Sequence, residues 1–523
     1  MADTEGGERR GRRRGRRRGA ETESDAPKQV IEQRPFQQPR LPFPPTELLS
    51  ADELEKIHQS SLTVLKEIGI DIIHEEAKAI LKEAGADVQP DGDRVRFDPE
   101  LVESVIGLAP EAFDFHARNP AHTTRMGENY ITYCAAASAP NAADMQGGRR
   151  AGNREDYRNF LKLGHQLNAV HIWGGYPVEP VDIHASVRHL ECLHDMLTMS
   201  DKAIHAYSLG KQRNLDAIEM VRIARGVDME TLKTQPSVIS IINSSSPLRL
   251  DTVMLEGVLQ MGRHGQPVVV TPFTLAGAMA PVTLAGALVQ QNAEALAGLV
   301  ISQLDSPGAP FVYGGFTSNV DMKSGAPAFG TPEMMRTSII GGQLARRYRL
   351  PYRSSNVNAA NAVDAQAAYE SVFALWGAVM GGVNMLKHGL GWMEGGLHTS
   401  FEKFILDADL LQMVTEFLTP IGMTDADMAI EAMREVGPGG HFFGCEHTQS
   451  RYKTAFYNPI ISDWRNYESW TEAGSPEAYG KANRIYRDLV AAYEPPAMEA
   501  DRREELDAFV ARRLEEGGVE TDF

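Results

Sequence analysis

Eight short apolar runs alternate with longer helical stretches from residue 129 onward, and this alternation limits the folds open to the chain. Such runs are typical of a parallel sheet that is buried on both faces. Eight βα units close a barrel, whereas an open doubly wound sheet usually has fewer strands and a G-x-G-x-x-G fingerprint, which is missing after the first run. We therefore predict an α/β protein with a (β/α)8 TIM barrel over 129–410. The runs are 131–135, 170–173, 203–207, 238–242, 267–271, 310–313, 351–354 and 383–386.

The segments on either side of these units differ in composition from the barrel region. Residues 1–44 are poor in apolar residues, rich in Arg, Glu and Gln, and end in a Pro-rich stretch, which predicts a disordered tail. Ser50 and Glu53 form a capping-box pattern ahead of apolar residues at helical spacing. We expect an N-terminal helical cap over 45–128, lying over a barrel end, and a C-terminal helical layer over 411–523 that packs on the barrel.

Charge is unevenly distributed along the chain. The net charge is −18, and residues 9–18 carry eight arginines, so the remainder is near −26. No aromatic residue interleaves these arginines as base stacking would require, so a nucleic-acid partner is not expected. The sequence has no apolar run of 18 residues, and its N-terminus is Arg-rich where a signal peptide would be apolar, which predicts a cytoplasmic protein. The three cysteines lie far apart, so no structural metal is expected.

Residues that follow the strands of such a barrel converge on one face, where catalysis takes place. The expected lining is rich in aromatic and hydroxyl side chains and poor in lysine, which does not favour a phosphate-bearing substrate. It suits a cation without N–H donors, because aromatic faces attract a quaternary ammonium by roughly 1–2 kcal/mol per desolvated contact. Aromatic residues also pack barrel mouths, so the set is more informative than any member. The candidates are Gln146, Trp173, Tyr176, His205, Tyr207, Asn243, Phe273, Tyr313, Phe316, Asn358, His388, Trp392 and Glu394.

Two histidines are the strongest individual candidates. His388 lies in the sequence KHGLG, where glycines allow the backbone to approach a large ligand, and no apolar periodicity explains the residue. His205 ends a buried strand and is either a ligand contact or a core histidine with satisfied hydrogen bonds. We therefore predict a functional role for His388, whereas the sequence does not decide between the two interpretations of His205.

Four segments resemble the trimethylamine methyltransferase family, and the match extends over residues 50–500. They are 313–333, 363–370, 391–397 and 436–441. The resemblance implies a (β/α)8 barrel that passes a methyl group from a methylamine to cobalt(I) of a cobalamin on a small corrinoid protein. The archaeal trimethylamine enzyme carries pyrrolysine in the stretch leading into its D-A-Q-A motif, whereas residues 354–363 are ordinary here. The chain is therefore more similar to the non-pyrrolysine members, which include glycine betaine methyltransferases.

The resemblance also implies roles for individual residues. His388 lies where the family places a residue near the cobalt. Glu394 is a second catalytic candidate because of its place after the eighth run, where its carboxylate could add charge complementarity to an ammonium. Asp364 and Gln366 of the D-A-Q-A match, together with Gln146, are expected to bind the cofactor or orient loops around it. The expected substrate-binding residues are Trp173, Tyr176, Tyr313 and Phe316 around the ammonium, with His205, Asn243 and Asn358 as further contacts, the two asparagines for a betaine carboxylate.

A quaternary amine as the methyl donor is consistent with the lack of pyrrolysine in residues 354–363. Its nitrogen leaves as a neutral amine, so the protein has only to orient the donor and exclude water. Two alternatives stay open: a lyase or isomerase for a small acid that uses His388 and Glu394 as base and acid, and a betaine-type ligand-binding protein. We expect a small-molecule substrate, a small corrinoid protein as partner, no membrane contact and a homo-oligomer.

Overall fold

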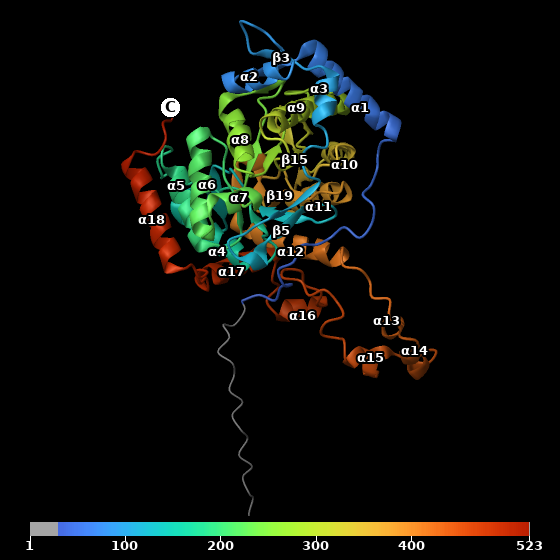
Figure 1. The fold of residues 1–523 in the computed structure, drawn as a ribbon. Coiled ribbons are helices and arrows are strands. Elements are labelled where there is room, and N and C mark those ends of the chain that lie inside the picture. The colour runs from blue at the N-terminus through green and yellow to red at the C-terminus, as the bar shows by residue number, and fades with distance from the viewer. Residues whose placement is uncertain (1–29, 522–523) are drawn as a thin grey trace, which may run out of the picture.

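A computed structural model describes residues 30–521 and contains a closed barrel of eight parallel strands (Figure 1). Each strand pairs with its neighbours along the chain, and the last pairs with the first to close the ring. All eight overlap the predicted runs, so the (β/α)8 fold is confirmed. The strands are β6 (Thr132–Ala135), β9 (Ile172–Trp173), β10 (Ala203–His205), β11 (Val238–Ile242), β13 (Val268–Val270), β15 (Phe311–Gly314), β18 (Tyr352–Ser355) and β19 (Met385–Leu390).

One long helix follows each barrel strand and covers its outer side. Several begin where the sequence supplies a capping side chain, as at Thr331 ahead of Pro332 and at Asp364, which accepts a hydrogen bond from the backbone N–H of Gln366 at 2.9 Å. The last of these helices crosses residue 410, so the barrel unit ends beyond the predicted boundary. The helices are α4 (Arg154–Gln166), α5 (Arg188–Met199), α6 (Lys211–Arg225), α8 (Thr252–Arg263), α9 (Leu284–Asp305), α10 (Pro332–Arg347), α11 (Ala365–Met380) and α12 (Phe401–Phe417).

The N-terminal segment contains strands as well as helices, which corrects the prediction of a purely helical cap. Helices α1 (Ala51–Thr63), α2 (Glu75–Glu83) and α3 (Pro99–Val105) pack on α9 at the flank of the barrel. Short strands β1 (Ile70–Ile72), β2 (Asp87–Val88) and β3 (Arg94–Arg96) form a small sheet beside them. The hairpin of β4 (Ala112–Phe115) and β5 (Thr124–Gly127) brings Phe113, Phe115 and Met126 into the core at the amino-terminal end of the barrel. That end is therefore closed.

Residues 30–44 are ordered, so the prediction of a disordered tail is wrong for this part of it. The segment runs along the amino-terminal end of the barrel, where Gln38 Nε2 donates to Thr132 Oγ1 at 2.7 Å and the N–H of Leu41 donates to the carbonyl of Asn129 at 2.9 Å. Phe36 packs against the ring of His171, at 5.1 Å between centroids. The prediction of disorder was based on the low apolar content of the segment, but these hydrogen bonds fix it to the barrel. The arginine run at 9–18 lies outside the described residues.

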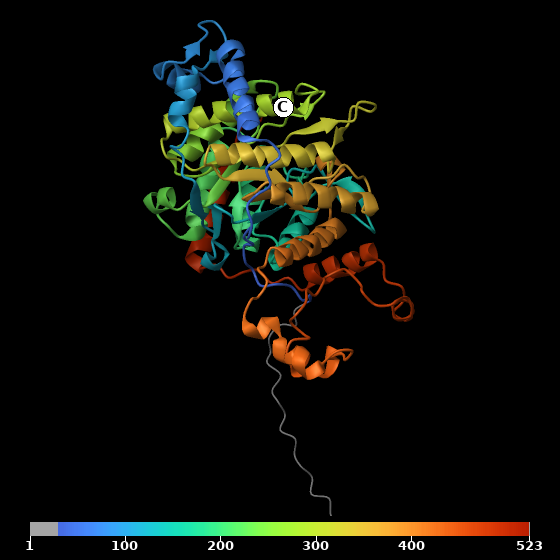
Figure 2. The ribbon, with the colours of Figure 1, turned by 90° about the vertical axis from the view of Figure 1, so that its right-hand side faces the viewer.

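The C-terminal region divides into packed helices and a protruding part. Helix α17 (Ala478–Ala491) packs on α12 and α4, and α18 (Ala500–Glu515) packs on α5 and α6. The short helices α13 (Asp425–Met428), α14 (Ile430–Val436) and α15 (Glu446–Gln449) stand clear of the barrel in both views (Figures 1 and 2). The predicted C-terminal layer is thus only partly packed on the barrel.

Helix α9 is the one described helix whose length and composition would allow it to cross a membrane. It is mostly buried, between barrel strands β13 and β15 on one side and α1, α2 and α3 on the other. The three cysteines are free and buried. Within residues 30–521, no group of three His, Cys, Asp or Glu residues is placed to hold a metal ion.

Candidate functional site

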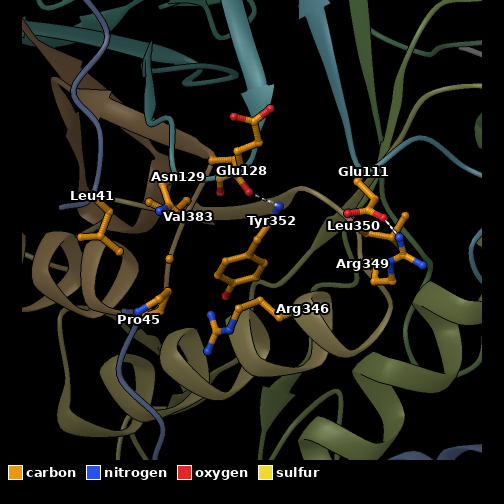
Figure 3. Close-up of a pocket in the computed structure, with 12 residues that line it drawn as sticks. Leu41, Pro45, Glu111, Glu128, Asn129, Arg346, Arg349, Leu350, Tyr352 and Val383 are labelled. Atoms are coloured by element: carbon orange, nitrogen blue, oxygen red, sulfur yellow. Dashed lines mark hydrogen bonds and ion pairs between the residues drawn. The ribbon is translucent and has the colours of Figure 1, made fainter. Parts of the chain in front are cut away.

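A small cavity lies at the amino-terminal end of the barrel, next to the starts of β6, β18 and β19 (Figure 3). Its volume is about 240 Å³, and its charged groups already have partners. Arg349 is paired with Glu111, and Nη1 of Arg346 donates to the carbonyl of Gly381 at 2.6 Å. Catalysis in (β/α)8 enzymes takes place at the opposite end. We therefore turn to the carboxyl-terminal end of the strands.

The carboxyl ends of the barrel strands surround a larger cavity of about 530 Å³. Its walls carry the aromatic side chains of Tyr207, Phe273, Phe316 and Trp392. The volume is in the range of small-molecule sites, which are mostly apolar with a few polar groups that fix the ligand. In this cavity the polar groups are His205, Lys387, His388, Arg353 and Glu179, with Asn243 at the rim.

Lys387 on β19 is a buried cation without a good acceptor in the protein. Its Nζ lies 3.3 Å from Nδ1 of His205. Nε2 of His205 accepts the N–H of Ile241 at 3.2 Å, so Nδ1 carries the proton and donates to the carbonyl of Gly174 at 2.7 Å. Because Nδ1 cannot then accept from Lys387, the ammonium has hydrogen-bonding capacity left for a ligand. Burial lowers the pKa of Lys387 to about 7.

Arg353 on the neighbouring strand β18 supplies a second buried cation. Its guanidinium lies over the ring of Phe316, 4.9 Å from the centroid, and its Nη1 donates to the carbonyl of Gly315 at 3.2 Å. Nε has no partner among the described residues. Burial lowers the pKa of Arg353 to about 10, so the group is charged at neutral pH. The floor of the cavity therefore holds positive charge that can receive an anionic group.

His388 combines an unusual backbone with an unsatisfied ring nitrogen. Its φ is +55°, a left-handed conformation that a non-glycine residue adopts at a cost and that is often found at functional sites. The ring stacks on Trp392 at 5.2 Å, and its buried Nδ1 has no partner in the described chain. Burial and the nearby charge of Arg353 hold the pKa of His388 well below 6.5, so the imidazole is neutral.

Glu179 is the one carboxylate among the described residues that line this cavity. It comes from the loop after β9 and lies near Arg188, with 3.6 Å between Oε2 and Nη1. Burial raises the pKa of Glu179 to about 7, against the opposing effect of Arg188. At neutral pH Glu179 is therefore only partly ionised, and the cavity has an ionisable carboxyl group at this wall and cationic groups at its floor.

The structure brings some of the predicted residues together at this cavity and places the others elsewhere. Those that line it are His205, Tyr207, Asn243, Phe273, Phe316, His388 and Trp392. Those outside its lining are Gln146, Trp173, Tyr176, Tyr313, Asn358, Asp364, Gln366 and Glu394.

Several of the residues outside the cavity are occupied by structural contacts. Glu394 is paired with Arg149 at 2.7 Å and with His398 at 2.9 Å. The hydroxyl of Tyr313 donates to Asn292 on α9 at 3.0 Å, so this ring faces the helical layer. The indole of Trp173 is fully buried and packs against Gly164 of α4.

The remaining polar candidates hold loops and helix ends. Gln146, in the turn between β7 (Asn141–Asp144) and β8 (Gly148–Ala151), exchanges hydrogen bonds with Asn483 at 2.9 Å. Gln366 donates to Glu370 at 2.8 Å. Asn358 Nδ2 donates to the carbonyl of Trp392 at 2.8 Å and so fixes the loop that carries this ring. Asp364 caps α11, and Tyr176 packs edge-on against Tyr207 at 4.5 Å.

The expected lining was poor in lysine, and the candidates did not include the two cationic residues at the cavity floor, Lys387 and Arg353. Sequence reasoning also missed Glu179. The available signal was a cationic residue inside a buried strand: Arg353 lies within β18, and Lys387 directly precedes His388 in β19. A charge in a strand buried on both faces costs too much free energy unless it meets a partner or a ligand.

Comparison with known proteins gives a consistent set of matches. The model of the family described as trimethylamine methyltransferase (MTTB) matches residues 9–518. Glycine betaine methyltransferase of Desulfitobacterium hafniense (strain Y51) is 36% identical over 91% of this chain and 99% of that protein. A trimethylamine methyltransferase of Methanosarcina mazei is 27% identical over 88% of this chain and 94% of its own. The monomethylamine methyltransferase structure from Methanosarcina barkeri covers 87% of this chain and 92% of its own, with 10% identity and a TM-score of 0.48.

Proposed function

The chain belongs to the trimethylamine methyltransferase family and is a methyltransferase, and we propose that it moves a methyl group from a quaternary amine of the glycine betaine type to cobalt(I) of a corrinoid on a small partner protein. The family assignment agrees with the resemblance in the sequence. The lyase and binding-protein alternatives have no comparable support. In particular, Glu394, which the lyase would need as its acid, is held by Arg149 and His398 outside the cavity.

The juxtaposition of a cationic floor and an aromatic wall carries this proposal. A betaine has a carboxylate and a quaternary ammonium a few bonds apart. Lys387 and Arg353 would hold the carboxylate through charge-assisted hydrogen bonds. Phe273, Phe316 and Trp392 would surround the ammonium, and Glu179 would add a negative charge near it. A donor without a carboxylate, such as trimethylamine, would leave the two cations unpaired.

The protein's part in the reaction is then binding, orientation and exclusion of water. As the C–N bond breaks, its electron pair goes to nitrogen and the positive charge of the donor disappears. No proton is required for this step, which agrees with the neutral state of His205 and His388. The fixed carboxylate would direct the N-methyl groups away from the floor and toward the mouth.

The mouth of the cavity has features that fit a corrinoid. The Nδ1 of His388 is a buried polar atom without a partner among residues 30–521, and the ring stacks on that of Trp392. His388 would therefore contact the corrinoid face or a water on it. When bound, the corrinoid supplies the reduced cobalt that accepts the methyl group.

A panel of donors tests the proposal directly. We expect cobalt(I) cobalamin to be converted to its methylated form with glycine betaine, and with other N-methylated amino acids that fit the cavity. Trimethylamine should give at least about 100-fold lower kcat/KM, because it cannot pair with the cationic floor. The spectrum of the cobalamin follows the reaction. Equal rates with glycine betaine and trimethylamine would contradict the proposal.

Binding of glycine betaine should exchange protons with solvent in opposite directions at pH 6 and pH 8. At pH 8 the free enzyme holds Lys387 largely neutral, and a bound carboxylate favours its charged form, so a proton is taken up. At pH 6 Lys387 is already charged, whereas Glu179 is largely protonated and a bound ammonium favours its ionised form, so a proton is released.

Titration calorimetry in buffers of different ionisation enthalpy measures this exchange. Removing the ionisable group of Lys387 should abolish the uptake at pH 8 and leave the release at pH 6. An absence of proton exchange at both pH values would show that these two groups do not contact the ligand.

A further inference from the structure

A further cavity lies at the carboxyl-terminal end of the barrel, next to helices α5 and α6, which run side by side (Figure 1). We call the cavity of about 530 Å³ the main cavity and this one, of about 270 Å³, the side chamber. Three residues line both, Glu179, Tyr207 and Leu209, so the two cavities share a wall. The side chamber is also lined by Arg188, His189, Leu193, Arg213, Val253 and Glu520.

The ring of Tyr207 forms part of the shared wall and is held in place. Its hydroxyl accepts a hydrogen bond from Ser138 Oγ at 2.9 Å and another from the backbone N–H of Tyr176 at 3.0 Å. The ring packs edge-on against His205, which lines the main cavity, and against Tyr176, which lines the side chamber. A single aromatic ring therefore stands between the two cavities at this point.

The side chamber contains a buried hydrogen-bond acceptor without a partner. His189 on α5 is 6% exposed, and its Nδ1 has no partner among residues 30–521. Its Nε2 lies 2.8 Å from Asp216, which also accepts from Arg513 Nε at 3.0 Å. Burial lowers the pKa of His189, so the ring is neutral at neutral pH. Burial opposes ionisation of Asp216, but the hydrogen bonds from His189 and Arg513 outweigh it and lower the pKa of this carboxyl.

These protonation states fix the tautomer of His189. The ionised Asp216 can only accept, so Nε2 of the neutral ring carries the proton and Nδ1 presents a lone pair. A buried acceptor that stays unsatisfied costs about 1–3 kcal/mol. The side chamber is therefore suited to a ligand that brings an N–H or O–H donor.

Two guanidinium groups give the side chamber positive charge. Nε and Nη2 of Arg188 both donate to the carbonyl of Ile183, at 3.1 and 2.9 Å. Its Nη1 lies 3.6 Å from Glu179, which is longer than a hydrogen bond and leaves this nitrogen able to donate to a ligand. Nη1 of Arg213 donates to the carbonyl of Leu209 at 2.8 Å, which fixes this second cation at the side chamber. A ligand carboxylate would therefore meet two cations beside the acceptor of His189.

Methyl transfer creates a molecule with the groups that this chamber can bind. When glycine betaine loses a methyl group, the C–N bond breaks, its electron pair stays on nitrogen and the methyl group bonds to cobalt. The product, N,N-dimethylglycine, then takes a proton from water, because aliphatic amines have a pKa of about 10. It carries an N–H group that glycine betaine lacks, whereas both molecules have the carboxylate. An unpaired acceptor close to two cations would therefore distinguish the product from the substrate.

We propose that the side chamber binds the demethylated product, a tertiary-ammonium carboxylate, with His189 Nδ1 accepting its N–H and with Arg188 and Arg213 facing its carboxylate. Leu193 and Val253 would contact its methyl groups. This inference rests on the proposed function, in which a corrinoid covers the mouth of the main cavity. A neighbouring site would let the product leave the donor position while the corrinoid protein is still bound.

The test is titration calorimetry of the full chain with N,N-dimethylglycine after the main cavity has been saturated with glycine betaine. One molecule per chain should still bind to the wild-type enzyme, and glycine betaine alone should bind at one per chain. His189→Leu should weaken the binding of N,N-dimethylglycine by at least about 10-fold, because it removes an acceptor for a charged donor. The affinity for glycine betaine should stay within about 3-fold, since His189 does not line the main cavity.

A second variant, Val253→Phe, reduces the volume of the side chamber from a partly exposed position and leaves the hydrogen bond between His189 and Asp216 in place. It should weaken the binding of N,N-dimethylglycine to a similar extent.

The matched control is His165→Leu. The Nδ1 of His165 also lacks a hydrogen-bond partner in the described chain, and burial lowers its pKa to about 4, but it lies outside the side chamber. This variant should keep both affinities.

The proposal would be overturned if the saturated wild-type enzyme bound no N,N-dimethylglycine, since the acceptor would then meet only water. Binding that neither His189→Leu nor Val253→Phe weakens would place the product elsewhere. Two molecules of glycine betaine per chain would show that the chamber does not select for N–H. Methylation of cobalt(I) cobalamin by the wild-type enzyme keeps the two proposals apart. Turnover without a second site would overturn the side chamber alone, whereas an absence of turnover would overturn the proposed function and with it the identity of this ligand.

Discussion

The Lys387→Met variant is expected to lose at least about 100-fold in kcat/KM for glycine betaine and to remain folded. The change removes a charge-assisted hydrogen bond to the substrate carboxylate inside a water-poor cavity, an interaction whose loss costs about 2–5 kcal/mol. Tetramethylammonium, which has no carboxylate, should react no more slowly with the variant than with the wild-type enzyme. Methylation of cobalt(I) cobalamin measures both rates. An equal loss with both donors would mean that Lys387 acts on the fold and not on the carboxylate.

Lys202 provides a matched control for this experiment. It is also buried, and burial likewise lowers its pKa to about 7. Its Nζ, however, donates to the carbonyls of Gly164 and Leu167 at 2.8 and 2.7 Å. Lys202→Met should therefore lower Tm, because two buried carbonyls lose their donor at about 1–3 kcal/mol each. It should leave the preference for glycine betaine intact.

Replacement of Lys387 should raise Tm, whereas replacement of Lys202 should lower it. Its pKa is lowered in the folded protein, so between pH 7 and 10.5 the unfolded chain binds a proton that the folded chain does not. The stability of the wild-type protein therefore gains from this group as pH rises through that window. Lys387→Met removes the cost of a buried ammonium and should raise Tm at pH 7. The two buried lysines have similar pKa values but different roles. Lys202 satisfies two buried carbonyl groups, and Lys387 lines the cavity, where it can bind a ligand.

The barrel could be predicted from the sequence because each of its strands is a separate apolar run with a helix behind it. The direction in which each side chain points could not be predicted, because an error of one residue in the position of a strand places its side chains on the opposite face. Ile172 and Val312 belong to the cluster in the barrel interior, so their neighbours Trp173 and Tyr313 face the helices. Met385 belongs to the same cluster, and Lys387 follows it by two residues to face the cavity.

Segments with weak patterns were the other source of error. The strands β1, β2 and β3 have two or three residues each, too few for an alternation to be recognised. The segment at 30–44 has few apolar residues and is held by backbone and amide hydrogen bonds, which leave no periodic signal. The position of His388 at the cavity could be predicted from its glycine-rich sequence context and its lack of apolar periodicity, whereas the contacts that hold Glu394 outside the cavity leave no such pattern in the sequence.

The His388→Asn variant is expected to lower kcat for corrinoid methylation by about 10- to 100-fold, the usual effect of removing a contact that orients a metal centre. Asparagine is chosen because it tolerates the left-handed backbone at φ +55°, so a loss of rate would not come from strain. The affinity for glycine betaine should stay within about 3-fold of wild type, since Lys387 and Arg353 remain in place. A fall in kcat without a change in substrate affinity would locate His388 at the cofactor side of the cavity.

Glu394→Gln is the comparison that separates this role from general acid–base chemistry. Glu394 also has a left-handed backbone, at φ +53°, but its carboxylate is bound by Arg149 and His398 away from the cavity. These hydrogen bonds outweigh partial burial and lower the pKa of Glu394, so it does not hold a proton to donate at neutral pH. The rate of this variant should remain within about 3-fold of wild type. If Glu394→Gln lost as much activity as His388→Asn, the two residues would act together as acid and base, and methyl transfer without proton movement would be the wrong mechanism.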